Sequence, residues 1–261
     1  MNRSSTIFFH ILLLFAITFF ATLIASLLTV GAESVFTYFG FQTMQNPWFD
    51  YVRLALQTCS IFGIPAMSIK YFDLHIVVFP FCYKKDKKLM WISILTWIFC
   101  ILPVYGLWEL NKSIKFPVFL SEMEETLRHM QSVNESFMNY LLAYRGIDHF
   151  LVLTVVVAIL PAIFEELFFR GILQQLLYKF SSNIWVAILT TSVVFSVFHM
   201  EFYALLPRIL LGALLGIAFA ASGKLWLPML IHFLNNFLGL ATQQFVSKPQ
   251  MDNLSQMGVT S

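Results

Sequence analysis

Charged residues are scarce in this sequence. Asp, Glu, Lys and Arg make up 11% of its 261 residues, less than half of the roughly 25% found in soluble domains. Hydrophobic residues make up 59%, including 29 Phe, and the mean hydropathy is +0.76. A soluble fold of this composition would expose large apolar patches, and a disordered chain would contain more charge and fewer aromatics. The composition therefore predicts an all-α fold, a polytopic transmembrane helical bundle, in a multi-pass integral protein of the cell membrane.

Other absences exclude further classes. The net charge is +2 and no basic stripe is present, which argues against a nucleic-acid partner. The three cysteines, Cys59, Cys82 and Cys100, form no CxxC pair, so neither a redox site nor a disulfide framework is expected. The sequence lacks HExxH, the helix-borne zinc motif, and GxSxG, the motif of a nucleophilic serine.

Long apolar runs predict about seven membrane spans plus one amphipathic surface helix. The N-terminal unit, residues 1–108, contains three candidate spans, and the core, residues 149–246, contains four. Their approximate ranges are 6–30, 51–69, 89–107, 150–180, 184–199, 207–222 and 225–245. The basic segment 84–88 predicts a cytosolic loop, with the N-terminus on the same side, because short basic loops stay in the cytoplasm. The first run exceeds the apolar core of a secretory signal, so we interpret it as an uncleaved span, with cleavage as the alternative.

Residues 109–148 differ in character from both units. They hold ten of the thirty charged residues in the chain. Apolar residues recur there at roughly helical spacing: Leu120, Met123, Leu127, Met130 and Phe137. The pattern favours an amphipathic helix on the membrane surface or capping the bundle, and a solvated linker helix is the alternative. The tail 247–261 is polar and is predicted to be disordered.

Two adjacent carboxylates lie inside the apolar run 150–180, which we expect to be interrupted near Pro161. Ionisable groups within a span are costly and therefore mark candidate functional sites. Glu166 and Arg170 are four residues apart and share a helix face, with the acid in the better N-terminal position for pairing. Glu165 is rotated by about 100° and has no partner in its own helix, which makes it a candidate general base. The alternative is a structural ion-pair cluster.

A histidine closes the next apolar run. His199 and Glu165 are each 17 residues from a turn centred near Ser182. If both arms are helical, the two side chains lie at the same level, about 25 Å from the turn. An interfacial histidine without a catalytic role is the alternative.

A histidine and an asparagine share a face in the last run. His232 and Asn236 are four residues apart and can donate hydrogen bonds to one anionic oxygen. Hydrogen bonding between helices is the alternative. Counting along straight helices leaves His232 about 10 Å from the level of His199, so tilt or irregular backbone near residues 200–206 must absorb the difference.

Together these groups suit hydrolysis. A carboxylate, two imidazoles and an amide in a dry bundle can activate a water molecule and stabilise a tetrahedral intermediate. Glu165, His199 and His232 could equally hold a zinc ion, because two histidines and a carboxylate form a catalytic zinc set.

The motifs resemble those of the CPBP family, which comprises the CAAX proteases and the bacteriocin-processing enzymes of the Abi type. The patterns EExxxR, FxxxH and HxxxN occur in order within residues 150–240. The resemblance implies an intramembrane endopeptidase whose catalytic transmembrane core encloses a cavity open to the cytosol. It implies that Glu165 and His199 activate water, that His232 and Asn236 form the oxyanion site, and that Glu166 and Arg170 hold the helix geometry. We favour a metal-free mechanism over a zinc mechanism, because an asparagine suits an oxyanion donor better than a zinc ligand.

The sequence thus predicts hydrolysis of a peptide bond in a membrane-associated protein or peptide, within or beside the lipid bilayer. A prenylated CAAX substrate and a bacteriocin-like leader peptide are both compatible with it. Two alternatives belong to other classes: a non-catalytic membrane scaffold or immunity factor with the same bundle, and a proton-coupled carrier. The absence of repeat symmetry argues against the carrier.

Overall fold

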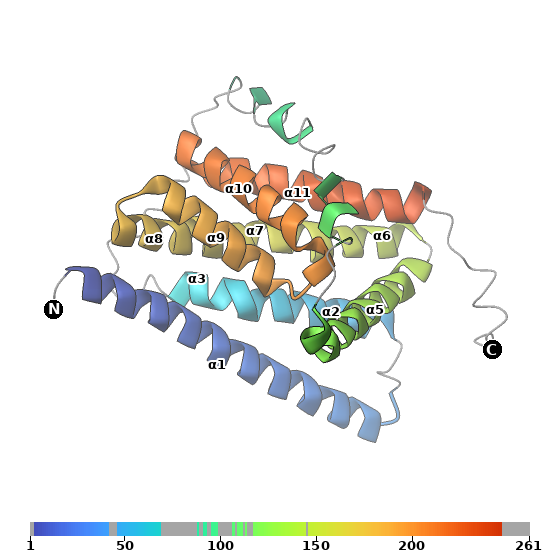
Figure 1. Cartoon of the computed structure of the whole chain (residues 1–261). Helices are drawn as coiled ribbons and strands as arrows, with labels where there is room; N and C mark the ends of the chain where they lie inside the picture. The colour runs from blue at the N-terminus through green and yellow to red at the C-terminus, as the bar shows by residue number, and fades with distance from the viewer. Residues whose placement is uncertain are drawn as a thin grey trace.

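The computed structural model is helical throughout the residues that it describes (Figure 1). These residues are 3–41, 46–68, 88, 91–92, 95–98, 106–107, 109–111, 113, 117–144 and 146–246. No strand occurs among them, which confirms the predicted all-α class. Residues 84–87 of the predicted basic loop, most of the third span and the polar tail lie outside these residues.

Three helices in the described part of the chain are long and apolar enough to cross a membrane. They are Ser5–Tyr38, Ile147–Ser181 and Phe202–Ser222, whereas the apolar helix Ile184–Phe198 is shorter. They agree with a multi-pass membrane protein. The total of about seven spans stays a prediction.

The N-terminal helices form the first two layers of the bundle. Helix α1 (Arg3–Tyr38) extends beyond the predicted span and ends before Gly40, which adopts a left-handed φ of +83°. The second helix runs through α2 (Pro47–Thr58), a π-helical segment (Cys59–Gly63) and α3 (Ile64–Ser68). Ile7 and Leu14 of α1 belong to one buried cluster with Phe62 and Phe168, so both layers pack toward the core. The remaining faces of α1 expose Phe and Leu side chains, as expected for contact with lipid.

A single long helix forms the next layer. It comprises α6 (Ile147–Leu153), a π-helical segment (Thr154–Ile159), α7 (Leu160–Phe168), a second π-helical segment (Phe169–Leu173) and α8 (Gln174–Ser181). The predicted interruption near Pro161 is absent from this helix. Proline has no N–H to offer the carbonyl four residues earlier, and that carbonyl, of Val157, instead accepts a hydrogen bond from the Asn236 amide at 3.4 Å. The π-helical segment thus replaces a break in the helix.

A tight turn precedes the next helix, at the position where the sequence predicts a turn. Ser182 adopts a left-handed φ of 53°. The Asn183 side chain then accepts hydrogen bonds from the backbone N–H groups of Trp185 and Val186 at 2.9 and 3.3 Å, which fixes the start of α9 (Ile184–Phe198).

The connection after α9 is irregular. Met200 adopts a left-handed φ of 53°, and a short 3₁₀ turn, Phe202–Ala204, precedes α10 (Leu205–Ser222). The buried Asn111 side chain clamps this connection, because its amide donates to the Phe202 carbonyl at 2.7 Å and its oxygen accepts from the Leu206 N–H at 3.3 Å. Helix α11 (Trp226–Ala241) then packs on α10, on α7 and on the π-helical segment before α7.

Two glycines let α10 approach its neighbours closely. A Cβ at Gly212 would lie 3.1 Å from both Cα and Cβ of Ser192 on α9, and a Cβ at Gly216 would lie 3.0 Å from the Gln174 side-chain oxygen. The close approach exposes two α10 carbonyls to side chains of the long helix. Arg170 donates to the Gly212 carbonyl at 2.9 Å, and Gln174 donates to the Gly216 carbonyl at 3.1 Å.

The predicted amphipathic segment contains helix α5 (Ser121–Ala143), preceded by a 3₁₀ turn, Val118–Leu120. Only its C-terminal end is buried, through Leu141 and Leu142. Arg128 stacks over Tyr203 at 4.9 Å from the ring centroid, which joins α5 to the connection after α9. The helix is observed where the pattern predicts it, and its location on the membrane surface stays a prediction.

Candidate active site

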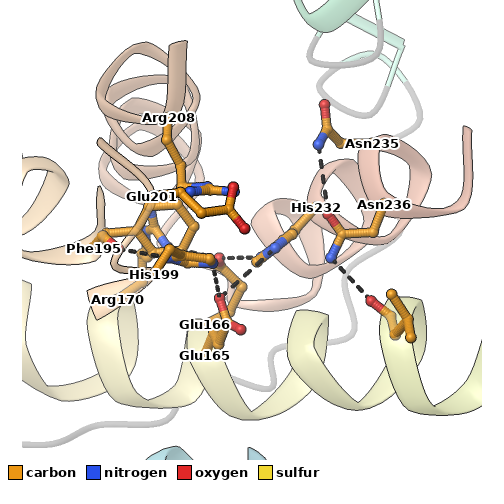
Figure 2. Close-up of polar contacts among 11 residues, drawn as sticks. Glu165, Glu166, Arg170, Phe195, His199, Glu201, Arg208, His232, Asn235 and Asn236 are labelled. Carbon is orange, nitrogen blue, oxygen red and sulfur yellow. Dashed lines mark hydrogen bonds and ion pairs between the residues drawn. The ribbon is translucent and has the colours of Figure 1, made fainter. Parts of the chain in front are cut away.

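Glu165 is the centre of a polar cluster inside the bundle (Figure 2). It lies on α7 and is 6% exposed. Its Oε2 atom is 3.6 Å from Nε2 of His199, at the end of α9, and 3.9 Å from Nε2 of His232, on α11. Among the described residues this oxygen has no hydrogen-bond partner. Three helices therefore direct one free carboxylate oxygen and two ring nitrogens toward a common point.

His199 is oriented by its own helix. Its Nδ1 atom is 2.8 Å from the Phe195 carbonyl. A carbonyl oxygen only accepts hydrogen bonds, so Nδ1 holds the hydrogen and, in the neutral ring, Nε2 is the free acceptor. The spacing of Phe195 and His199 in the sequence thus sets which ring nitrogen faces Glu165.

His232 is oriented by the second carboxylate. Its Nδ1 atom is 2.8 Å from Oε1 of Glu166, and the same oxygen accepts a hydrogen bond from Nη1 of Arg170 at 2.6 Å. The pairing of Glu166 with Arg170 follows from their spacing in the sequence. The bond to His232 does not, because it joins residues 66 positions apart, and no local signal indicates it. Glu166 therefore acts on the site through His232, in addition to neutralising Arg170.

Arg170 links the site to the rest of the core. The guanidinium and the Glu166 side chain are both 0% exposed. The Arg170 guanidinium also donates to the Gly212 carbonyl and lies 4.8 Å from the ring centroid of Phe195. A buried charge is tolerated only when it is paired and hydrogen-bonded, so these contacts hold α7, α9 and α10 in one arrangement.

Asn236 lies beside this cluster, one helical turn from His232 (Figure 2). Its amide points toward the long helix and donates to the Val157 carbonyl at 3.4 Å. Its side-chain oxygen accepts a bond from Asn235 at 3.5 Å. The structure thus groups Glu165, Glu166, Arg170, His199 and His232, and it holds Asn236 at the edge of that group.

An ion pair that the sequence reasoning missed lies next to His199. Arg208, on α10, is 2.7 Å from the Glu201 carboxylate in the connection after α9. Figure 2 shows both side chains beside His199. Arg208 lies in the apolar run 207–222, so the rule that singles out ionisable groups within spans could have found it.

Metal binding at this site depends on the donor groups and on their arrangement. Two imidazole nitrogens and a carboxylate oxygen are the chemistry that zinc prefers. However, within the ranges that the structure covers, no group of three or more His, Cys, Asp or Glu side chains has an arrangement that could hold a metal ion. We therefore derive no step through a metal.

The arrangement can bind and polarise a water molecule. The unbonded Oε2 of Glu165 and the two Nε2 atoms face one another at distances too long for direct hydrogen bonds. A carboxylate so placed can take a proton from water as a general base, and the oriented imidazoles can accept or return protons.

Part of this core is similar to known proteins. Residues 147–238 match the family described as Type II CAAX prenyl endopeptidase Rce1-like. A curated Escherichia coli protein, described as "Uncharacterized 24.3 kDa protein", is 32% identical over 110 residues, which are 41% of this chain and 51% of that protein. The chain thus spans about half the length of the curated relative that it matches. No solved structure matches. The predicted family is confirmed over the matched residues, and with it the multi-pass membrane location.

Proposed function

We propose, from the membership of residues 147–238 in the type II CAAX prenyl endopeptidase family, that this protein is an intramembrane endopeptidase. It hydrolyses a peptide bond in a membrane-associated protein or peptide, in the manner of CAAX processing. One observation supports this function above the others: the buried Oε2 of Glu165 faces two oriented ring nitrogens and has no hydrogen-bond partner among the described residues.

In the proposed reaction, Glu165 and His199 activate the attacking water. The water oxygen forms the new bond to the scissile carbonyl carbon while one of its protons passes to Glu165. The carbonyl π electrons move to oxygen, which gives a tetrahedral oxyanion. When that intermediate collapses, the carbon–nitrogen bond breaks and the proton held by Glu165 passes to the leaving nitrogen. No metal or cofactor is needed to balance these steps.

His232 is proposed to stabilise the oxyanion. Because its Nδ1 hydrogen is directed to Glu166, Nε2 becomes a donor only when the ring takes up a proton. The Asn236 amide, held by a long bond to the Val157 carbonyl, supplies a second donor when it turns toward the site.

Purified protein in proteoliposomes tests this function on a membrane-tethered peptide. Glu165→Gln and His199→Ala are each expected to lower kcat/KM by about 10²–10⁴-fold, the usual contribution of general acid–base catalysis. Glu125→Gln on the exposed face of α5 is the matched control, since it also removes a single carboxylate. Cleavage that survives both active-site substitutions at the wild-type rate contradicts the proposal and favours the scaffold.

A further inference from the structure

The ion pair of Glu201 and Arg208 is held beside the active site by unusual backbone. Glu201 follows Met200, whose φ of 53° is left-handed, and precedes the 3₁₀ turn that Asn111 clamps. These contacts hold the backbone on both sides of Glu201, and the pair lies next to His199 (Figure 2). A left-handed conformation at a methionine is uncommon, and such strain concentrates at functional sites.

Arg208 has donor capacity that its partner leaves unused. Its Nη2 atom bonds to Glu201 at 2.7 Å, whereas its Nη1 atom is buried and has no hydrogen-bond partner within the described part of the chain. The side chain is 20% exposed and that of Glu201 is 35% exposed. A guanidinium presents a planar fork that matches a carboxylate through two parallel bonds. Here one side of the fork bonds a partly exposed carboxylate, and the other side is a buried N–H group without a partner among the described residues.

Two arginines lie close to the site among the described residues. Arg170 is fully buried and committed to Glu166 and to the Gly212 carbonyl. Arg208 is partly exposed beside His199, so within the described part of the site it is the cation that can meet an anionic group on a bound molecule (Figure 2). A CAAX box lies at the C-terminus of its protein, so a substrate cut near its end brings an α-carboxylate to the site.

We propose that Arg208 is a specificity-determining residue that binds the terminal α-carboxylate of the substrate, and that Glu201 occupies the guanidinium until the substrate arrives. This inference rests on the proposed endopeptidase function. Glu201 stands in for the substrate carboxylate and prevents an uncompensated charge in the empty site. Substrate binding exchanges one carboxylate for another, and the peptide then makes the second bond that Glu201 does not make.

Binding in a non-cleaving background separates recognition from hydrolysis. Three membrane-anchored peptides that share one core sequence are compared in phosphatidylcholine vesicles, which carry no net charge. The first ends in a free carboxylate, the second in a carboxamide, and the third in a carboxamide after a terminal Glu residue. Affinities are measured with Glu165→Gln protein, and kcat/KM is measured with protein that retains Glu165.

The free-acid peptide is expected to bind about 10-fold or more tightly than either carboxamide, as for hydrogen bonds to charged groups. Arg208→Gln is expected to bring this ratio close to one, and Arg208→Lys, which keeps the charge and the fold, to an intermediate value. Arg53→Gln, which removes a half-buried arginine from its ion pairs with Glu33 and Asp50, keeps the full ratio. Glu201→Gln removes the competing carboxylate and increases affinity for the free acid alone.

Each contrary result has a distinct meaning. Equal affinity for all three peptides, or a ratio that persists in both Arg208 variants, overturns the role of Arg208. Equal binding of the free acid and the terminal-Glu carboxamide overturns recognition of the chain end. Selective binding of the free acid without any cleavage by protein that retains Glu165 supports carboxylate recognition while it contradicts the proposed hydrolysis.

Discussion

Replacing Glu166 by Gln is expected to destabilise the bundle by about 3–5 kcal/mol, the usual cost of breaking a buried ion pair from one side. The substitution leaves the Arg170 cation without its counter-ion at a place where both side chains are 0% exposed. The remaining contacts of Arg170, to the Gly212 carbonyl and to the ring of Phe195, orient the guanidinium but do not neutralise it.

The double variant Glu166→Gln/Arg170→Gln separates the structural role of the pair from its role in the site. It removes both charges, so it is expected to be more stable than either single variant. Its activity is not expected to return, because the carboxylate that orients the His232 ring is still absent. The second substitution should therefore restore stability without restoring activity.

Chemical denaturation in detergent micelles measures the stability of each variant, and kcat/KM is measured at a temperature where all variants are folded. The pair Glu124 and Arg128 has the same spacing and the same 2.6 Å contact, but its side chains are 23% and 59% exposed, so Glu124→Gln is the matched control, with a smaller expected change. If Glu166→Gln costs no more stability than Glu124→Gln, or if the double variant is less stable than both singles, the reasoning on the buried pair is refuted.

Three further predictions concern the close contacts around the site. Gly212→Ala is expected to cost about 1–3 kcal/mol by overpacking, whereas Gly239→Ala, where a Cβ meets no atom within 4 Å among the described residues, is expected to be tolerated; equal melting temperatures would contradict this. Asn111→Ala is expected to cost about 1–3 kcal/mol, because it leaves a partly buried carbonyl and a partly buried N–H unpaired, and to lower kcat/KM by shifting Glu201; wild-type kinetics would exclude such positioning. Activity is expected to survive metal chelators, and loss of activity that zinc restores would instead establish a zinc enzyme.

Local patterns in the sequence predicted much of the site. The spacing of Glu166 and Arg170 implies a pair on one helix face, and that pair is present. Counting residues from the turn at Ser182 put Glu165 and His199 at one level, and the two side chains lie 3.6 Å apart. Both inferences succeed because an α-helix has a fixed rise and a fixed number of residues per turn.

The same counting failed where the backbone leaves regular geometry. It put His232 about 10 Å from the level of His199, yet His232 Nε2 lies 3.9 Å from Glu165. The left-handed Met200 and the 3₁₀ turn after it lie in the segment where irregular backbone had to absorb the difference. A positive φ at a methionine has no sequence signal. Pro161 is the converse case, since it led us to expect a break and a π-helical segment preserves the helix.

The sequence by itself determined that the chain is a helical membrane protein, because the scarcity of charge leaves no other environment for so many apolar residues. It also determined which few ionisable residues are stranded among apolar ones, since that cost is visible in composition alone. Only the tertiary structure decided how those residues are connected. The hydrogen bond from His232 to Glu166 and the tautomer that it sets arise from contacts between helices that are distant in sequence. Such contacts depend on helix packing, which the spacing of residues along one helix does not encode.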